Sequence, residues 1–155
     1  MGVLKGHGLS IDVPANWEGR IFVPALPAPA INLPILHLTD TVLPLQRSTY
    51  APEVAARAGS SGALVALAEF EDRLADRGLY APQGLRLPLR RETFDTRALQ
   101  LPNPSQEGHQ RFFSQGGRAF CLYVVLGTAP GVDWRLRTVN HALATLKVTP
   151  RKGRA

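Results

Sequence analysis

The most regular hydrophobic pattern in the chain lies on either side of Gly116 and Gly117. A Gly-Gly pair between two runs rich in aromatic and β-branched residues predicts a hairpin, because a type I′ turn needs φ > 0 at both central positions. A two-residue turn places Phe113 opposite Phe120. The second run, residues 119–126, is apolar on both faces. We therefore expect a central strand covered on both sides, with the hairpin in the middle of a sheet.

A helix is predicted after this hairpin, from Asp133 to Leu146. Asp133 can cap its start. Apolar residues are interpreted as one stripe at helical spacing: Trp134, Leu136, Val139, Leu143 and Leu146. The helical pattern then stops before Pro150, which indicates a short final strand at Lys147 and Val148. Residues 151–155 form a small basic tail that we expect to be frayed.

Four earlier segments read as strands. Leu9 to Val13 and Arg20 to Val23 have extended patterns on either side of Asn16, which predicts an N-terminal hairpin with its turn at Asn16. Ile35 to Leu38 is a further short strand. Ala63 to Phe70 is a longer one, and it ends abruptly in acidic residues.

Proline and glycine interrupt the other apolar runs. Pro24 to Pro34 is expected to be an extended crossing segment. Pro44 to Gly62 is expected to be a long, partly mobile loop, with one or two helical turns at Pro52 to Ala58. Leu85 to Arg91 is a strand candidate that its Pro88 places at a sheet edge.

Composition agrees with one globular α+β domain over residues 1–150. The chain has 155 residues, of which 45% are hydrophobic and 19% charged, so one core is expected. Its 13 prolines and 14 glycines leave little room for long helices. We expect an antiparallel sheet of about six strands, flanked by few helices, with the C-terminal helix packed on the sheet.

The charge favours acidic partners. The formal net charge is +6 and the pI is about 10.2. Basic residues form two groups, one at Arg86, Arg90 and Arg91 and another from Lys147 to Arg154. Neither group alternates with aromatic residues as a platform for single-stranded nucleic acid does, so nucleic-acid binding is not favoured.

Other sequence features exclude several classes of protein. The one cysteine, Cys121, cannot form an intramolecular disulfide, and it lies in the most apolar run, where we expect a buried structural thiol. No apolar stretch is long enough to span a bilayer, and the N-terminus lacks the layout of a signal peptide. We therefore expect a cytoplasmic protein.

Three motifs carry a resemblance to known domains: Val13-Pro14-Ala15-Asn16-Trp17, the run from Gly117 to Val124, and the run from Val139 to Val148. The chain resembles a group of small bacterial domains of unassigned activity and, more distantly, the PsbP/Mog-type fold. The resemblance implies an antiparallel sheet flanked by helices. It also implies a role as a protein-binding or accessory subunit without catalysis. The motifs are core and turn residues and identify no ligand.

Candidate chemistry is sparse. The histidines lie in different elements and never at metal-ligand spacing, and no glycine-rich phosphate loop is present, so neither metal nor cofactor is expected. His37, inside an apolar run, is expected to be a hydrogen-bonded core residue. The one tight carboxylate group is Glu69, Glu71 and Asp72. It is interpreted as a solvated strand end.

Three hypotheses follow. The leading one is a non-catalytic domain, not an enzyme, that works through an unidentified protein partner or by self-association. Its candidate binding residues are Trp17, Glu69, Glu71, Arg90 and Arg91, although Trp17 is expected mainly to pack on the N-terminal hairpin. The second is a small-ligand binder or enzyme that uses the same two glutamates and two arginines in one polar cleft. The third is an electrostatic binder of a polyanion.

Overall fold

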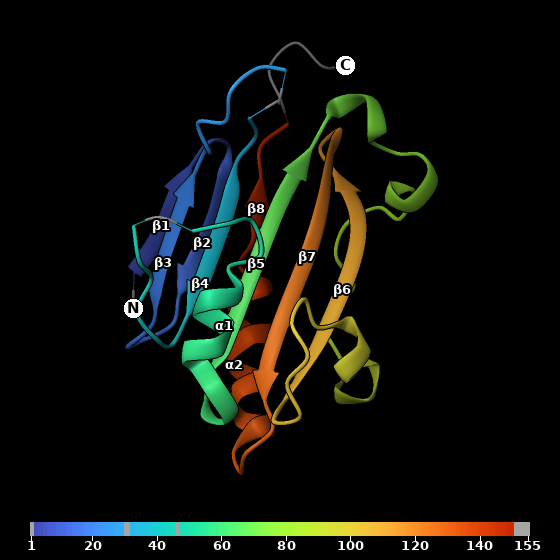
Figure 1. Cartoon of the computed structure of the whole chain (residues 1–155). Coiled ribbons are helices and arrows are strands. Elements are labelled where there is room, and N and C mark those ends of the chain that lie inside the picture. The colour runs from blue at the N-terminus through green and yellow to red at the C-terminus, as the bar shows by residue number, and fades with distance from the viewer. Residues whose placement is uncertain (1, 30–31, 46, 151–155) are drawn as a thin grey trace.

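The part of the chain that the structure describes forms two antiparallel sheets and two α-helices (Figure 1). The computed structural model describes residues 2–29, 32–45 and 47–150. The elements are β1 (Gly2–Gly6), β2 (Leu9–Val13), β3 (Glu18–Phe22), β4 (Ile35–Thr39), α1 (Pro52–Ala58), β5 (Ala63–Phe70), β6 (Gln106–Gln115), β7 (Arg118–Gly127), α2 (Val132–Leu143) and β8 (Lys147–Val148). The larger sheet has the order β3-β4-β5-β7-β6 and the smaller one β1-β2-β8.

The β6–β7 hairpin has the register that its two-residue turn predicts. Gly116 and Gly117 have φ of 61° and 72°, and Phe113 pairs with Phe120. Every residue of β7 is buried, as expected for a strand covered on both faces. The hairpin is not in the middle of the sheet, however, because β6 is an edge strand. A turn fixes which two strands pair, but it does not determine what lies beyond them.

The N-terminal hairpin differs from the prediction. β2 pairs with β1 through a turn at His7 and Gly8, which have φ of 52° and 78°. β3 pairs with β4 in the larger sheet, so the turn at Asn16 leads the chain from one sheet to the other. The short and mostly exposed Gly2–Gly6 segment gives no alternation strong enough to be recognised as a strand.

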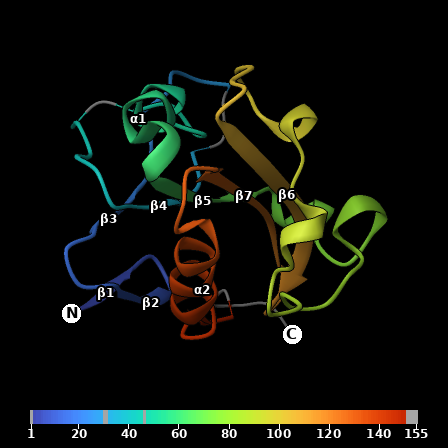
Figure 2. The same ribbon diagram turned by 90° about the horizontal axis from the view of Figure 1, so that it is seen from below.

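The larger sheet is covered on both faces (Figure 2). One face packs against α2 and the smaller sheet, in a core that includes Leu9, Ile11, Leu36, Leu38, Val65, Leu67, Phe113, Phe120, Leu122, Val124, Leu136, Val139 and Leu143. The other face packs against α1 through Leu64, Ala66, Tyr123 and Val125. The strands predicted around Ile35 and Ala63, the short helix α1 and the final strand β8 are all confirmed.

Helix α2 ends earlier than predicted and has a different buried stripe. It buries Leu136, Val139, Ala142 and Leu143, whereas Trp134 is 66% exposed. An α-helix turns about 100° per residue, so Trp134 and Leu136 lie about 200° apart and cannot share a face. The predicted stripe is therefore wrong at its first member.

The predicted cap of α2 is also different. The residue before the helix is Gly131, and no side chain caps the helix start. Arg135 instead donates to the carbonyls of the preceding loop, at 2.8 Å to Gly127 and also to Ala129. This leaves the carboxylate of Asp133 available to other elements.

The segment from Leu85 to Arg91 is not a strand. Its backbone pairs with the Asn140 side chain of α2 and not with a strand. Leu89 donates its N–H to Asn140 Oδ1 at 2.7 Å, and its carbonyl accepts from Asn140 Nδ2 at 3.0 Å. Leu89 is buried in the core under α2. The apolar residues of this segment therefore add to the core beside α2. This explains why the segment has the apolar pattern of a strand although it pairs with no sheet.

No helix among residues 2–29, 32–45 and 47–150 is both long and apolar enough to cross a membrane.

Candidate functional site

Glu69, a predicted binding residue, lies inside the core in an ion pair with Arg118. The two side chains are 0% and 2% exposed. Arg118 donates Nε to Glu69 Oε2 at 3.0 Å and Nη2 to Glu69 Oε1 at 2.7 Å. Its other contacts are backbone carbonyls: His7 at 2.9 Å, Thr149 at 3.0 Å and Gly8 at 3.3 Å. These five bonds match the five N–H donors of a guanidinium.

This buried pair connects distant parts of the fold. Arg118 begins β7 and Glu69 belongs to β5, while the carbonyls come from the β1–β2 turn and from the residue after β8. The interaction therefore joins the two sheets. Its carboxylate is engaged in the interior and is not presented to a ligand.

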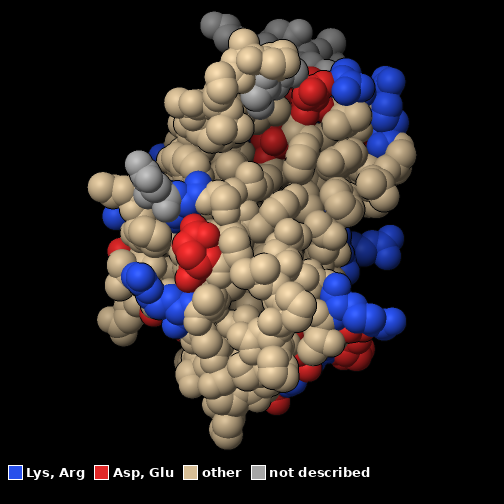
Figure 3. Space-filling model, viewed as in Figure 1, with Lys and Arg blue, Asp and Glu red and all other residues tan. Residues whose placement is uncertain are grey.

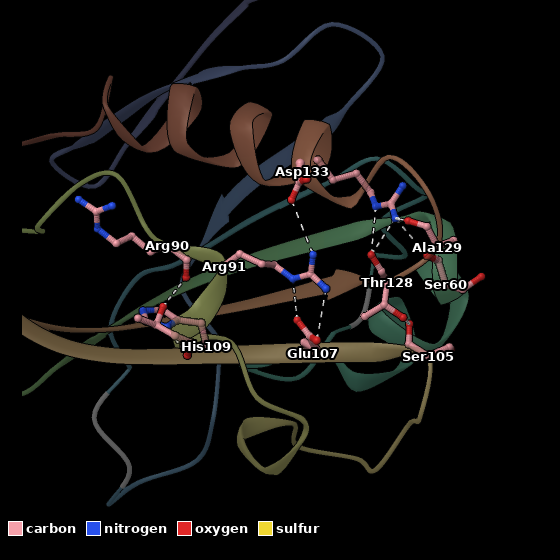
Figure 4. A network of polar contacts seen from close by, with 12 residues as sticks. Ser60, Arg90, Arg91, Ser105, Glu107, His109, Thr128, Ala129 and Asp133 are labelled. Carbon is pink, nitrogen blue, oxygen red and sulfur yellow. Dashed lines mark hydrogen bonds and ion pairs between the residues drawn. The ribbon is translucent and has the colours of Figure 1, made fainter.

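The other charged candidates also have partners. Glu71 forms an exposed ion pair with Arg73. Arg91 donates to Glu107 on β6 at 2.9 Å, and its Nη1 lies 3.7 Å from Asp133 Oδ1 at the start of α2 (Figure 4). The hydrogen bond to Glu107 raises the pKa of Arg91. Arg91 thus connects its loop to both β6 and α2.

The two glutamates and two arginines do not form one cleft. Glu69 lies opposite Phe120 on β7, whereas Glu107, the partner of Arg91, lies opposite Leu126. Six residues along a strand span about 20 Å, so the two groups are near opposite ends of the sheet. Arg90 points away from the Arg91 network (Figure 4).

A hollow of about 190 Å³ lies beside the end of β5, and Glu69 and Glu71 contribute to its wall. The Glu69 side chain has no exposed surface, so its carboxylate does not open into this hollow. Its described lining residues include no histidine or arginine. The hollow therefore lacks the acid–base arrangement that the second hypothesis requires.

His37 is a core histidine with both ring nitrogens bonded. Its Nε2 donates to the Thr49 carbonyl at 2.7 Å, and its Nδ1 accepts from Arg47 Nε at 3.0 Å. Burial lowers the pKa of His37 to about 4. The Arg47 guanidinium also lies 4.6 Å from the centre of the Phe22 ring. The predicted structural role of His37 is confirmed.

The remaining groups of interest are also held within the fold. Cys121 is buried, and burial raises the pKa of its thiol. His109 is buried with Nδ1 3.3 Å from the Thr93 carbonyl, and burial lowers its pKa; its Nε2 contacts no hydrogen-bond partner among the described residues. Within the described part of the chain, no three histidine, cysteine or acidic side chains come together as metal ligands would.

A mainly apolar hollow lies between α2 and the β2–β3 connection. We call this hollow of about 330 Å³ the Trp134 groove. It is lined by Asp12, Pro14, Ala15, Trp134, Arg137, Thr138, His141 and Ala142. Most of these side chains are apolar or neutral, and Trp134 supplies the largest exposed one.

Helical spacing gathers the polar side of α2 in this groove. Trp134, Arg137, Thr138 and His141 occupy positions i, i+3, i+4 and i+7 of the helix, so they share one face. The Arg137 guanidinium lies 5.8 Å from the Trp134 ring centre, which is within reach of a cation–π contact.

A larger hollow of about 680 Å³ adjoins the Trp134 groove and shares Asp12 with it. It runs beside β8, and Lys5 and Lys147 are among its lining residues. The combined surface thus carries two lysines and Arg137 against one carboxylate, Asp12.

Sequence reasoning selected the other tryptophan. Trp17 is partly buried and packs against the main core, although the N-terminal hairpin on which it is predicted to pack does not form. The predicted stripe places Trp134 in the core, yet the 100° rotation per residue of an α-helix sets Trp134 opposite Leu136.

Comparison of the chain with protein-family models, with curated proteins and with solved structures gives no match.

Proposed function

We propose that this chain is a non-catalytic binding module whose protein partner docks on the Trp134 groove. The observation that carries the proposal is the 66% exposure of Trp134 beside a concave apolar surface. Tryptophan and arginine dominate the binding energy of many interfaces, and exposed apolar surface next to a hollow is typical of a contact site. The opposite face of α2 makes the contacts with the core. Trp134 is therefore not needed to pack the helix on the sheet.

The charges around the groove indicate the chemistry of the partner. Arg137 has no carboxylate within ion-pair distance among the described residues, and the same holds for Lys5 and Lys147. A partner that places an apolar side chain against Trp134 and carboxylates beside these cations would match both features.

The engagement of the reactive groups supports a role without catalysis. Glu69 is paired with Arg118, both nitrogens of His37 are bonded, and the Cys121 thiol is buried. General acids, bases and nucleophiles must reach a substrate. These three side chains stabilise the interior instead.

For the fold, we propose a PsbP/Mog-type arrangement. An antiparallel sheet with a C-terminal helix packed on one face and a short final strand supports this proposal. Accessory subunits of that wider fold act through partners, in agreement with the binding role proposed for the Trp134 groove.

Trp134→Ala is expected to weaken binding of the native partner by about thirtyfold, corresponding to about 2 kcal/mol, because it removes the anchor side chain. The free energy of unfolding should change little, since Trp134 is mostly exposed. The partner would be isolated with the tagged chain from the native cell extract, and its affinity for each variant measured by calorimetry.

Leu79→Ala is the matched control for this experiment, because Leu79 is 67% exposed and lies outside the groove. It should bind as the parent chain does. A partner that binds Trp134→Ala and the parent chain with equal affinity would remove the basis of the proposal.

The polyanion hypothesis rests partly on residues 151–154, which lie outside the described residues. Binding to duplex DNA that stayed unchanged at high salt would contradict its electrostatic mechanism, because phosphate contacts weaken as counterions compete.

A further inference from the structure

The outer edge of β6 is covered by its own chain at both ends. Ser114 donates its N–H to the Pro82 carbonyl at 2.8 Å and accepts from Gly84 at 2.7 Å. Gly108 exchanges two hydrogen bonds of 2.9 Å with Asp95. Both residues therefore point their backbone groups away from β7. Because these directions alternate along a strand, Gln110 and Phe112 must point outward as well.

Between those two contacts the chain leaves the edge. Residues 85–94 pass over the face that carries α2, where Leu89 is bonded to Asn140 (Figure 2). Within the described residues, no backbone hydrogen bond reaches the outward groups of Gln110 or Phe112. We call these two N–H and two C=O groups the β6 edge gap.

A hollow of about 340 Å³ opens beside this gap. Arg86, Arg111 and Phe112 are among the residues that line it, with Pro82, Gln83 and Gly84. Neither Arg86 nor Arg111 has a carboxylate within ion-pair distance among the described residues. Lys and Arg side chains also gather along the margin of the molecule next to β6, whereas the α1 face carries few charges (Figure 3).

The two faces of the sheet beside the β6 edge gap carry different side chains. Arg111 shares the α2 face with its neighbour Leu122 on β7. Phe112 is on the other face, where its ring meets Tyr80 edge-on at 5.4 Å. A strand added at this edge would place alternate side chains on these two faces. Acidic residues would meet the arginines, and apolar residues would meet Phe112.

We propose that the β6 edge gap binds a short extended segment of a partner protein, with acidic and apolar residues in alternation. Backbone hydrogen bonds to Gln110 and Phe112 supply the pairing, and Arg86 and Arg111 select the acidic face. A second copy of this chain fits less well, because two-fold antiparallel pairing centred on the gap sets Arg111 opposite its own counterpart, and like charges directly opposite each other repel. This surface is separate from the Trp134 groove.

The test uses a capped seven-residue peptide of alternating glutamate and valine, followed by the amide resonances of the full chain. Addition of the peptide should shift the Gln110 and Phe112 amides, and the binding should weaken as salt is raised. A peptide with lysine in place of glutamate should bind at least about tenfold more weakly.

Gln110→Pro is the sharpest variant, because it removes an N–H that faces outward and leaves the backbone hydrogen bonds between β6 and β7 in place. It should weaken binding by about tenfold or more, whereas Gln110→Ala, which keeps the N–H, should not. Arg86→Glu combined with Arg111→Glu should reduce binding of the acidic peptide, and Arg57→Glu, on α1, serves as the charge control. Amide spectra establish that each variant is folded.

Several outcomes would overturn the proposal: no shift at Gln110 and Phe112, equal binding by Gln110→Pro, or no preference for the acidic peptide. Self-association of the chain that Gln110→Pro abolishes would identify a second copy as the occupant and would also overturn it. Trp134→Ala should leave the peptide affinity unchanged, so failure here is distinguishable from failure of the Trp134 groove.

Discussion

Arg118→Met is expected to lower the free energy of unfolding by about 3–5 kcal/mol, because it leaves the buried Glu69 carboxylate without its cation. It also removes the donors from the carbonyls of His7, Gly8 and Thr149, which the aliphatic methionine side chain cannot replace. Urea denaturation of the parent and the variant measures the difference.

Three further variants make this experiment decisive. Arg118→Lys keeps the charge but has fewer donors and should lose less stability than Arg118→Met. Glu69→Gln removes the negative charge yet leaves the three carbonyl contacts in place, so it should also cost less. Arg73→Met, which breaks the exposed pair with Glu71, should cost about 0–1 kcal/mol. Equal losses for Arg73→Met and Arg118→Met would contradict the structural role of the buried pair.

The second large effect is a loss of stability as the pH falls from about 6.5 to about 4. Burial holds the folded-state pKa of His37 below its unfolded value, so the unfolded chain takes up the proton first. The contribution of neutral His37 to the free energy of unfolding is therefore fully present above pH about 6.5. It decreases as the pH falls toward the pKa that His37 has in the folded state. The shift of His37 corresponds to about 3 kcal/mol, and denaturation at several pH values measures it.

His37→Gln provides the control for this pH dependence. The glutamine amide can donate to the Thr49 carbonyl and accept from Arg47 as the neutral ring does, but it does not titrate. Stability of this variant should depend less on pH in the same range. The free energy of unfolding of this variant should still fall with decreasing pH, but less steeply, because burial also lowers the pKa of His109. An unchanged slope in His37→Gln would contradict the assignment.

Local features of the fold could be read from the sequence. The Gly116–Gly117 pair fixed both the turn and the register, because left-handed φ values and a two-residue loop leave few alternatives. The apolar run Ala63–Phe70 likewise predicted β5. The error at Trp134 arose from helix spacing, since residues two apart were assigned to one stripe.

Long-range arrangements could not be read in this way. Arg118 and Glu69 are 49 residues apart, and nothing in either local pattern indicates that they meet. Leu85–Arg91 has an apolar alternation that suits a strand, but its backbone bonds to Asn140, which lies 51 residues from Leu89. The edge gap of β6 exists because this loop leaves the sheet, so it too depends on contacts that sequence alone does not show.

Site-specific photocrosslinking at the Trp134 groove determines whether a protein partner docks there. A photoreactive benzoylphenylalanine would replace Trp134 in one variant and Leu79 in another, and both would be irradiated in native cell extract. We expect a distinct protein adduct at position 134 that is absent at position 79 and is reduced by Arg137→Glu. Adducts that form equally at both positions, or a folded position-134 variant that gives none, would contradict it.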